Sequence, residues 1–527
     1  MQESLSSSRV VAHNAFYNLA GYAASAAYVF FIIPIIVGYL GVQQFGLWSL
    51  MLALAGYVGL ADLGLSTSFV KYIAEFVSLN EQTKVNRVIQ LGATFYVLLT
   101  IVLLIVGWLA FPFVFGLLKV PQEQYSLGLH AFLLSLLNFG VGGVSGVLAG
   151  TLAGFQRSDL FNRLLAVSYL ARFVVILLVL ANGGGLLGLI AADMAVGGAL
   201  IIPLWFSGKK HCPGISLRFA GYDHQLMKSL LRFGLQLQIS RFAELVQAQF
   251  DKLLITRYVS LGSVSMYDFG SRPLGRIRSL PLTAVSALVP AVSSLQAEQD
   301  ADRIFAAFVR GTRYILAFGL PVFALCVCFA HELIFVWLGP GFDAAALTIQ
   351  ILAPGYFVSV VAGVLALVSQ GKGEPKVQMY AMMIQAVVNI GLSFALITSF
   401  GFFGAVSGTS VSAVLGGLLF FRWYGKRLTD RPLSLLLRLA SKPFLSIVPA
   451  AVAGMGIVAV MHASGYFDSR TATLLAVMAG SVAFLLLYGL MLVVSKALTP
   501  DDKEFFKKTI PGRFVRLSRQ HPEERIP

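Results

Sequence analysis

The stretch QISRFAELVQAQFDKLLITRYV, residues 238–259, combines two properties that rarely occur together. It has the length and the apolar fraction of a membrane span, yet it carries Arg241, Glu244, Asp251 and Lys252. A charged side chain at the bilayer centre costs about 2.5–3.5 kcal/mol on insertion scales. A span that retains four of them is expected to turn them toward a water-filled cavity or to pair them within a helical bundle.

The whole chain is strongly apolar. Of its 527 residues, 57% are hydrophobic and 12% are charged, and the mean hydropathy is +0.80. A soluble domain carries about 25% charged residues, so the composition excludes that class and predicts an all-α polytopic membrane protein. Apolar runs of about 20 residues predict about fourteen transmembrane helices, at residues 14–40, 46–69, 91–117, 126–152, 160–181, 185–207, 233–257, 263–288, 312–337, 345–369, 377–399, 402–424, 442–462 and 471–495.

The distribution of basic residues predicts the orientation. Most of the 39 Lys and Arg residues fall at the N-terminus, in the loops after even-numbered spans and in the C-terminal tail. Lys119, Arg257 and Arg470 alone fall in the opposite loops. Because cytoplasmic loops retain positive charge, both termini of this multi-pass protein are predicted to be cytoplasmic. The net charge of +15 is then a topology signal together with a tail that lies against anionic headgroups, and nucleic acid is not expected as a partner.

The longest cytoplasmic loop falls midway through the first twelve spans. We therefore predict an N-terminal six-helix bundle (1–207), a linker (208–232), a C-terminal six-helix bundle (233–427), two extra helices (428–496) and a basic cytoplasmic tail (497–527). A weak internal similarity supports two halves. GYLGVQQFGLWSL (38–50) and RYVSLGSVSMYDF (257–269) each join the first two spans of a half through a Tyr and a Gly-bearing turn. Substrate sites of transporters built from such repeats lie between the halves.

These segments resemble a known family. YLG (39–41), FGLW (45–48) and ADLGL (61–65) are similar to the opening helices of the polysaccharide transporter family, and QFDKLLITRYVSLGSVSMYDFGSRP (249–273) is similar to its seventh-to-eighth helix passage. The resemblance implies a fold similar to multidrug and toxin extrusion transporters and the lipid II flippase, with two six-helix bundles around a central cavity that opens alternately to the two sides. It also implies the flipping of lipid-linked oligosaccharides.

The charged face of residues 238–259 has two interpretations. At 100° per residue, its polar side chains occupy an arc of about 140°, and the opposite side is apolar. In the next span Asp268, Arg272 and Arg276 follow at helical spacing and continue a polar face. The side chains either line a cavity or form structural ion pairs, Arg241 with Glu244 and Asp268 with Arg272. The excess of cations favours the cavity.

An excess of Arg and Lys suits an anionic ligand, and guanidinium offers the bidentate hydrogen bonds that suit a diphosphate. The polyprenyl tail of such a substrate would remain in lipid while the diphosphate and its sugars cross the cavity. A buried ion pair with Asp193 is the alternative role for Arg172. The predicted substrate-binding residues are Arg241, Lys252, Arg272, Arg276 and Arg172.

Acidic and amide side chains within spans are candidates for other roles. Ion coupling to an H⁺ or Na⁺ gradient, or gating, is assigned to Asp62, Glu244, Asp251 and Asp268. A polar cavity wall, or interhelical hydrogen bonding, is assigned to Asn14, Asn18, Gln385 and Asn389. No metal site and no cofactor are expected, because the three Cys residues form no ligand pattern.

An enzyme is not expected. The sequence contains no GxxxxGK[ST] loop, no HExxH and no GxSxG. A glycan polymerase or ligase would bind the same substrates but generally uses a large extracytoplasmic loop, which the predicted topology lacks. A channel or scaffold is also less well supported. The paired halves, the basic faces and the family resemblance together predict a bacterial inner-membrane flippase that translocates a polyprenyl-diphosphate-linked oligosaccharide by alternating access for surface polysaccharide biosynthesis. Its expected partners are the lipid-linked substrate, membrane lipids and polysaccharide polymerase machinery. A cation-coupled multidrug exporter of the same fold is the alternative.

Overall fold

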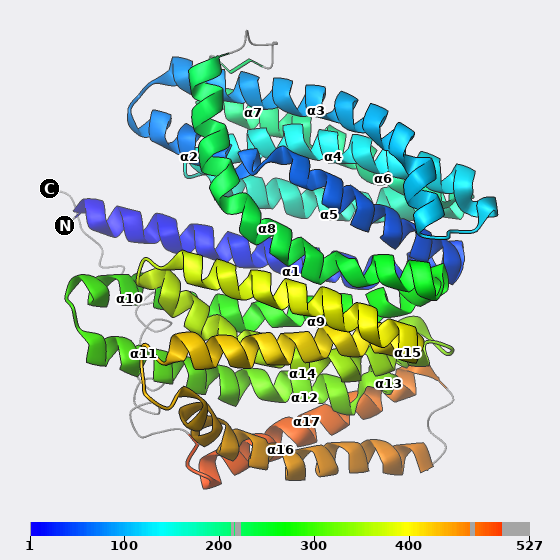
Figure 1. Cartoon of the computed structure of the whole chain (residues 1–527), viewed down its shortest axis with the longest axis vertical. Coiled ribbons are helices and arrows are strands. Elements are labelled where there is room, and N and C mark those ends of the chain that lie inside the picture. Colours follow the sequence, from blue (N-terminus) through cyan, green and yellow to red (C-terminus); the bar gives the residue numbers. More distant parts are fainter. Residues whose placement is uncertain (1, 212–214, 217–222, 464–468, 498–527) are drawn as a thin grey trace, which may run out of the picture. The chain divides into compact units, whose positions relative to one another are not determined.

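The fold was analysed on a computed structural model, in which the described part of the chain is built from helices (Figure 1). The structure describes residues 2–211, 215–216, 223–463 and 469–497; the side chains of residues 2–20, 211, 236–237 and 239–240 are not described. The basic tail beyond residue 497 therefore lies outside the described residues. An all-α polytopic membrane protein, as predicted, is confirmed.

The helices follow one another with short connections. In chain order they are α1 (Gln2–Val58), η1 (Gly59–Asp62), α2 (Leu65–Ser78), α3 (Gln82–Leu117), η2 (Gln122–Gln124), α4 (Tyr125–Gly154), α5 (Ser158–Ala181), α6 (Gly185–Ala199), α7 (Ile201–His211), α8 (His224–Tyr258), α9 (Leu261–Ala284), α10 (Leu288–Ala297), α11 (Ala301–Tyr314), η3 (Ile315–Gly319), α12 (Leu320–Cys328), α13 (Ala330–Leu338), α14 (Asp343–Gly371), α15 (Pro375–Gly425), α16 (Pro432–Ala463) and α17 (Arg470–Val494).

Eleven helices among the described residues are long and apolar enough to cross a membrane. The number of fourteen spans is not confirmed, and the difference arises at three places. Predicted spans 14–40 and 46–69 fall on one long helical segment that breaks at Gly41 (φ 74°), and spans 377–399 and 402–424 share α15, which breaks at Gly401 (φ 58°). The third place is α8, which is long enough to span but carries too many ionisable side chains to be counted among the eleven apolar helices.

The chain divides into two compact units. Unit 1 comprises Met1–Arg276 and Met379–Ser412, and unit 2 comprises Ile277–Gln378 and Ala413–Pro527. α9 and α15 each contribute residues to both units. The bundle boundaries at 1–207 and 233–427, which rest on the internal similarity, stay a prediction.

Small residues let the helices of unit 1 approach closely. A Cβ on Gly140 or Gly143 of α4 would lie 2.1 Å from Thr100 Oγ1 or 2.2 Å from the ring of Tyr96, both on α3. Such glycine contacts are typical of helix pairs in membranes, where van der Waals packing drives association. Tyr96 also belongs to a buried apolar cluster that joins α2, α3 and α4. Tyr96 links this packed region to the turn between α1 and α2, because its Oη donates to Asp62 there.

A second close approach fixes the beginning of α8. Gly64, in the turn before α2, has φ 74°, and a Cβ there would lie 2.3 Å from the carbonyl oxygen of Gly234 on α8. Ser68 Oγ donates to the carbonyl oxygen of Leu230 over 2.8 Å. These contacts hold α8 against the turn between α1 and α2, where Asp62 lies.

In unit 2, α16 and α17 lie side by side (Figure 1). Gly454 and Gly480 meet at their crossing, where a Cβ on either residue would lie 2.9 or 2.8 Å from the other's carbonyl oxygen. The outward residues of this pair are large and apolar, including Leu445 and Leu486, whose exposed fractions are 72% and 70%. An exposed apolar face of this kind suits lipid rather than water.

Candidate functional site

A buried group of charges joins α8 and α9 in unit 1. Lys252 Nζ lies 2.7 Å from Asp268 Oδ1, and Arg272 donates to Asp268 Oδ2 over 2.5 Å. Ser49 Oγ on α1 donates to the same Oδ2 over 2.5 Å. Lys252 and Asp268 are 5% and 1% exposed. This Asp268 cluster (Ser49, Lys252, Asp268 and Arg272) holds two cations against one carboxylate and so carries a net formal charge of +1.

The two stretches that resemble each other in sequence meet at this cluster. Ser49 and Asp268, its central hydrogen-bonded pair, are separated by 219 residues and occupy matching positions in those stretches. Other contacts in the same place are reciprocal. Ser265 Oγ donates to the carbonyl oxygen of Val42 over 2.6 Å, and a Cβ on Gly46 would lie 1.9 Å from the carbonyl oxygen of Leu261. The cluster is therefore built where the two similar turns pack against each other.

Arg272 is the member of the cluster that reaches a cavity. Its guanidinium carbon lies 5.3 Å from the ring centre of Trp48 and 5.8 Å from that of Phe45. Its side chain is 25% exposed and lines a cavity of about 200 Å³, which also includes Tyr28, Asn138 and Asp193. We call this the smaller cavity. Lys252 is enclosed, so the positive charge of the cluster is presented through Arg272.

Asp193, which also lines the smaller cavity, belongs to a second ion pair. Arg172 on α5 donates to Asp193 Oδ1 on α6, and Asn138 on α4 donates to Asp193 Oδ2 over 2.8 Å. The sequence alternative of an Arg172–Asp193 pair is thus present. Arg172 Nε is buried without a hydrogen-bond partner among the described residues. The pair links α5 to α6, and a role of Arg172 in substrate binding stays a prediction.

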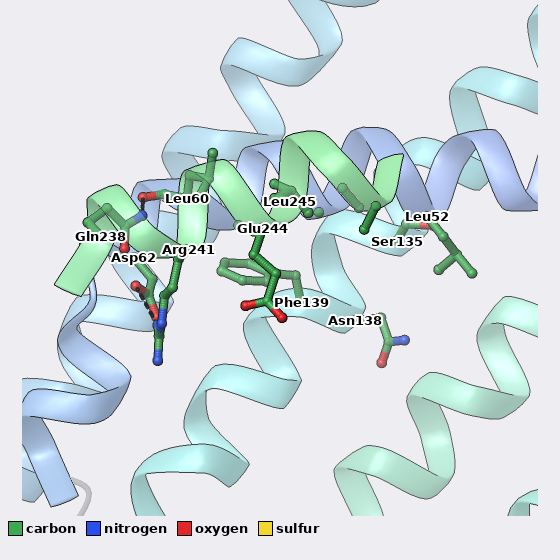
Figure 2. Close-up of a pocket in the computed structure, with 14 residues that line it drawn as sticks. Leu52, Leu60, Asp62, Ser135, Asn138, Phe139, Gln238, Arg241, Glu244 and Leu245 are labelled. Carbon is green, nitrogen blue, oxygen red and sulfur yellow. Dashed lines mark hydrogen bonds and ion pairs between the residues drawn. The ribbon is translucent and has the colours of Figure 1, made fainter. Parts of the chain in front are cut away.

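A larger cavity of about 510 Å³ lies along α8 and shares Leu52, Ser135 and Asn138 with the smaller one. Figure 2 shows Arg241 beside Asp62, with Glu244 projecting between that pair and Asn138. The atoms Arg241 Nη1 and Asp62 Oδ1 are 3.8 Å apart.

Asp62 and Arg241 also form hydrogen bonds with other residues in and near the turn between α1 and α2. The carboxylate of Asp62 accepts hydrogen bonds from Gly64 N–H over 2.5 Å and from Tyr96 Oη over 3.1 Å. Arg241 donates to Ser66 Oγ over 3.0 Å and to Thr67 Oγ1. The i,i+3 pair of Arg241 with Glu244, considered as structural glue, is not formed. Glu244 has neither an ion pair nor a hydrogen bond among the side chains that the structure describes.

Asp251 lies in a separate buried group without a cation. It is 0% exposed, and its Oδ2 accepts from Tyr267 Oη over 2.8 Å and from Thr409 Oγ1. Asn389 Nδ2 donates to Thr409 Oγ1 over 3.1 Å and to Ser393 Oγ over 3.3 Å. Asp251 Oδ1 and Asn389 Oδ1 are buried with no partner among the described atoms. This Asp251 cluster (Asp251, Tyr267, Asn389, Ser393 and Thr409) therefore presents two unpaired oxygens inside unit 1.

The remaining sequence candidates lie elsewhere. Arg276 lies over Tyr22, 5.7 Å from the ring centre, and its carbonyl oxygen accepts from Tyr22 Oη over 2.9 Å. It lines neither of the two cavities described above. Gln385 is half-buried on α15 and lines neither cavity. Asn14 and Asn18 lie outside the residues whose side chains are described.

Several residues of the site were not predicted from the sequence. Trp48, Ser49 and Asn138 carry no charge, and Thr409 and Tyr267 reach Asp251 from other helices. The match of Ser49 with Asp268 in the two similar stretches was the one available signal. A cluster of three or more His, Cys, Asp or Glu side chains able to hold a metal ion is absent from the described residues.

Two protein-family models match the part of the chain that contains most of these site residues. The family model described as polysaccharide biosynthesis protein matches residues 11–296, and the MatE model matches residues 238–395. A candidate O-antigen transporter of Shigella flexneri is 20% identical over 79% of this chain and 97% of its own length. EpsK, a membrane protein of Bacillus subtilis, is 26% identical over 78% of this chain and 82% of its own. Agl15 of Haloferax volcanii, a candidate flippase of low-salt glycan biosynthesis, is 22% identical over 72% of this chain and 76% of its own.

Solved structures support the fold. The lipid II flippase MurJ, in an inward closed conformation, aligns with a TM-score of 0.69 over 91% of this chain and 98% of its own at 12% identity. An inward-facing multidrug resistance transporter of the MATE family aligns with a TM-score of 0.67 over 79% of this chain and 95% of its own at 15% identity. Identities this low establish the fold alone. Because the first family model covers more than half of the chain, this protein belongs to the polysaccharide biosynthesis protein family.

Proposed function

We propose that this protein is a flippase that moves a polyprenyl-diphosphate-linked oligosaccharide across a bacterial inner membrane by alternating access, with both termini in the cytoplasm. The similarity to an O-antigen transporter of Shigella and to a glycan biosynthesis flippase of Haloferax supports this proposal, and the distribution of Lys and Arg supports the orientation. No covalent step is part of the proposal. Polysaccharide polymerase machinery would consume the flipped glycan on the outer side.

The observation that carries the proposal is the charge of the Asp268 cluster. Two cations share one carboxylate, so the cluster has positive charge to offer a ligand. Arg272 presents it to the smaller cavity, where surrounding protein lowers the effective dielectric constant and strengthens electrostatic attraction relative to bulk water. Guanidinium binds phosphate oxygens through charge-assisted hydrogen bonds. We therefore assign binding of the diphosphate to Arg272. Lys252 neutralises Asp268 and so leaves the charge of Arg272 available to the ligand.

The assignment to Arg272 is tested by substrate binding. Arg272→Ala is expected to weaken binding of a polyprenyl-diphosphate oligosaccharide about tenfold to hundredfold, since hydrogen bonds to charged groups contribute about 1.5–3 kcal/mol. Arg272→Lys should lose less, because it keeps the charge without the fork of donors. Binding to the protein in lipid nanodiscs is the measurement.

The control for this experiment is Arg303→Ala, which removes an arginine of α11 whose side chain is 70% exposed. It should bind like the wild type. The Arg272 variants keep Lys252 beside Asp268, so the buried carboxylate still has a compensating positive charge. Equal affinities of wild type and Arg272→Ala would refute the diphosphate assignment.

We further propose that the Asp251 cluster couples transport to an ion gradient. A buried carboxylate that has no partner cation is stable when it binds a proton or a cation. Its unpaired Oδ1, the unpaired Asn389 Oδ1 and the neighbouring hydroxyls supply oxygen ligands only. One carboxylate balances one positive charge, so we assign H⁺ or Na⁺ rather than a divalent cation.

Asp251→Asn is expected to abolish stimulation of flipping by an imposed ion gradient while leaving substrate affinity unchanged. The reason is that an amide neither releases a proton nor neutralises Na⁺. Flipping rates in proteoliposomes with separate Na⁺ and pH gradients measure this and identify the ion. A variant that remains fully gradient-dependent would exclude Asp251 as the coupling site.

A second candidate function has one observation in its favour. In the larger cavity Asp62 and Glu244 outnumber Arg241, and an acidic cavity suits a cationic compound. This is the property expected of a cation-coupled multidrug exporter of the same fold. The Asp268 cluster, with its excess positive charge, favours the flippase instead.

A further inference from the structure

The larger cavity has a charge that differs from that of the smaller one. Asp62, Arg241 and Glu244 are the ionisable residues that line it. Asp62 and Arg241 lie within 3.8 Å of each other and are held by the turn around Gly64. Glu244 is exposed and has no partner among the described side chains. The net formal charge of the lining is thus −1, and one free carboxylate supplies it.

Glu244 is the side chain of the larger cavity whose charge is left to meet a ligand. Its carboxylate accepts only, when ionised. Gln238 donates from its Nε2 to the carbonyl oxygen of Leu60 over 2.6 Å, and its Oε1 is buried. Arg241 is compensated by Asp62 and donates to Ser66 and Thr67. A ligand that brings hydroxyl or amino donors would satisfy the Glu244 carboxylate, whereas a ligand that brings a further carboxylate beside it would not.

The two cavities are adjacent, because Leu52, Ser135 and Asn138 line both. A substrate whose diphosphate contacts Arg272 in the smaller cavity can therefore extend its sugars into the larger one. The larger volume, about 510 Å³ against about 200 Å³, suits the bulkier part of the molecule. A pocket of this size with few polar groups is typical of sites that bind small ligands.

We propose that the larger cavity receives the sugars next to the diphosphate and that Glu244 makes it select neutral or amino sugars over sugars that bear a carboxylate. The inference rests on the proposed flippase function and adds the chemical class of the glycan. Hydroxyl and ammonium groups donate to Glu244 in charge-assisted hydrogen bonds. A uronic acid would place a second negative charge beside Glu244, and like charges brought side by side repel each other.

The test compares two probes that differ in one functional group. They are polyprenyl-diphosphate disaccharides with a terminal glucose or a terminal glucuronic acid, and their flipping is measured with the full chain in proteoliposomes. The wild type is expected to flip the neutral probe about tenfold faster or more, from the repulsion between like charges. Glu244→Gln should narrow the gap by raising the rate for the acidic probe, and Glu244→Asp, which keeps the charge, should retain the preference.

Glu298→Gln is the matched control, since the side chain of Glu298 is 61% exposed and lies outside both cavities. It should leave the ratio of the two rates as in the wild type. Equal rates for the two probes in the wild type would overturn the inference while leaving the flippase function intact, and so would an unchanged ratio in a folded Glu244→Gln protein. Failure of the wild type to move either probe would instead refute the flippase function itself. The ratio of the two flipping rates in the wild type tests the inference by itself, because it does not depend on whether any variant folds.

Discussion

Asp268→Asn is expected to lower the free energy of unfolding by about 3–5 kcal/mol, the loss found when one partner of a buried ion pair is removed. The substitution leaves Lys252 enclosed, at 5% exposure, with its partner carboxylate gone. Arg272, also bound to that carboxylate, would add repulsion between like charges. The effect is measured by heating the protein in detergent and following the fraction that remains monodisperse as the temperature rises.

The double variant Lys252→Met/Asp268→Asn distinguishes a charge effect from a packing effect. It removes both enclosed charges, and exchange of a buried pair for apolar groups is often nearly neutral. We therefore expect it to recover most of the stability that Asp268→Asn loses. Asp302→Asn on α11, at an exposed position, serves as the control. If the single variant were as stable as this control, the Asp268 cluster would not hold α8 to α9.

Gly46→Val is expected to prevent stable folding or to cost more than about 3 kcal/mol, at the upper end of what overpacking costs. Even the first added carbon would lie 1.9 Å from the carbonyl oxygen of Leu261 and 3.0 Å from Ser265 Oγ. The first obstacle is backbone, which cannot rotate away as a side chain does. The start of α9 would have to move from α1, and the hydrogen bond from Ser49 to Asp268 would be lost with it. Yield and unfolding temperature measure the effect.

Gly38 provides a matched position on the same helix. Its surroundings within 4 Å are open, and it is exposed. Gly38→Ala should therefore be neutral or stabilise by about 0.5–1 kcal/mol, because alanine loses less backbone entropy in a helix than glycine. A Gly46→Val protein as stable as the Gly38→Ala protein would contradict the close approach of α1 and α9.

The fold was predictable from the sequence where hydropathy decides it. Long apolar runs mark nearly every helix, because a spanning segment must satisfy its backbone internally. The number of separate helices was harder to predict. At Gly41 and at Gly401, two predicted spans belong to one helical segment that is broken at a single glycine with positive φ. Hydropathy marks the two apolar runs but does not show whether they form one segment or two.

The site was predictable only in part. Charge within an apolar run correctly pointed to α8 and α9, since such residues rarely face lipid. The sequence did not show that Lys252 turns toward Asp268 while Arg272 reaches a cavity, because this depends on how α8 and α9 pack against each other and against α1. Thr409, which donates to Asp251 from 158 residues away, has no signal in its own segment. Partners of this kind depend on how distant helices pack.

Transbilayer movement in proteoliposomes measures directly whether this protein flips a diphosphate-linked glycan. A fluorescent polyprenyl-diphosphate oligosaccharide and a cationic dye would be tested on the same wild-type preparation. We expect the glycan lipid to become accessible in the opposite leaflet faster than in protein-free vesicles, and we expect the dye not to move. Movement of the dye without movement of the glycan lipid would refute the flippase function and favour the multidrug exporter.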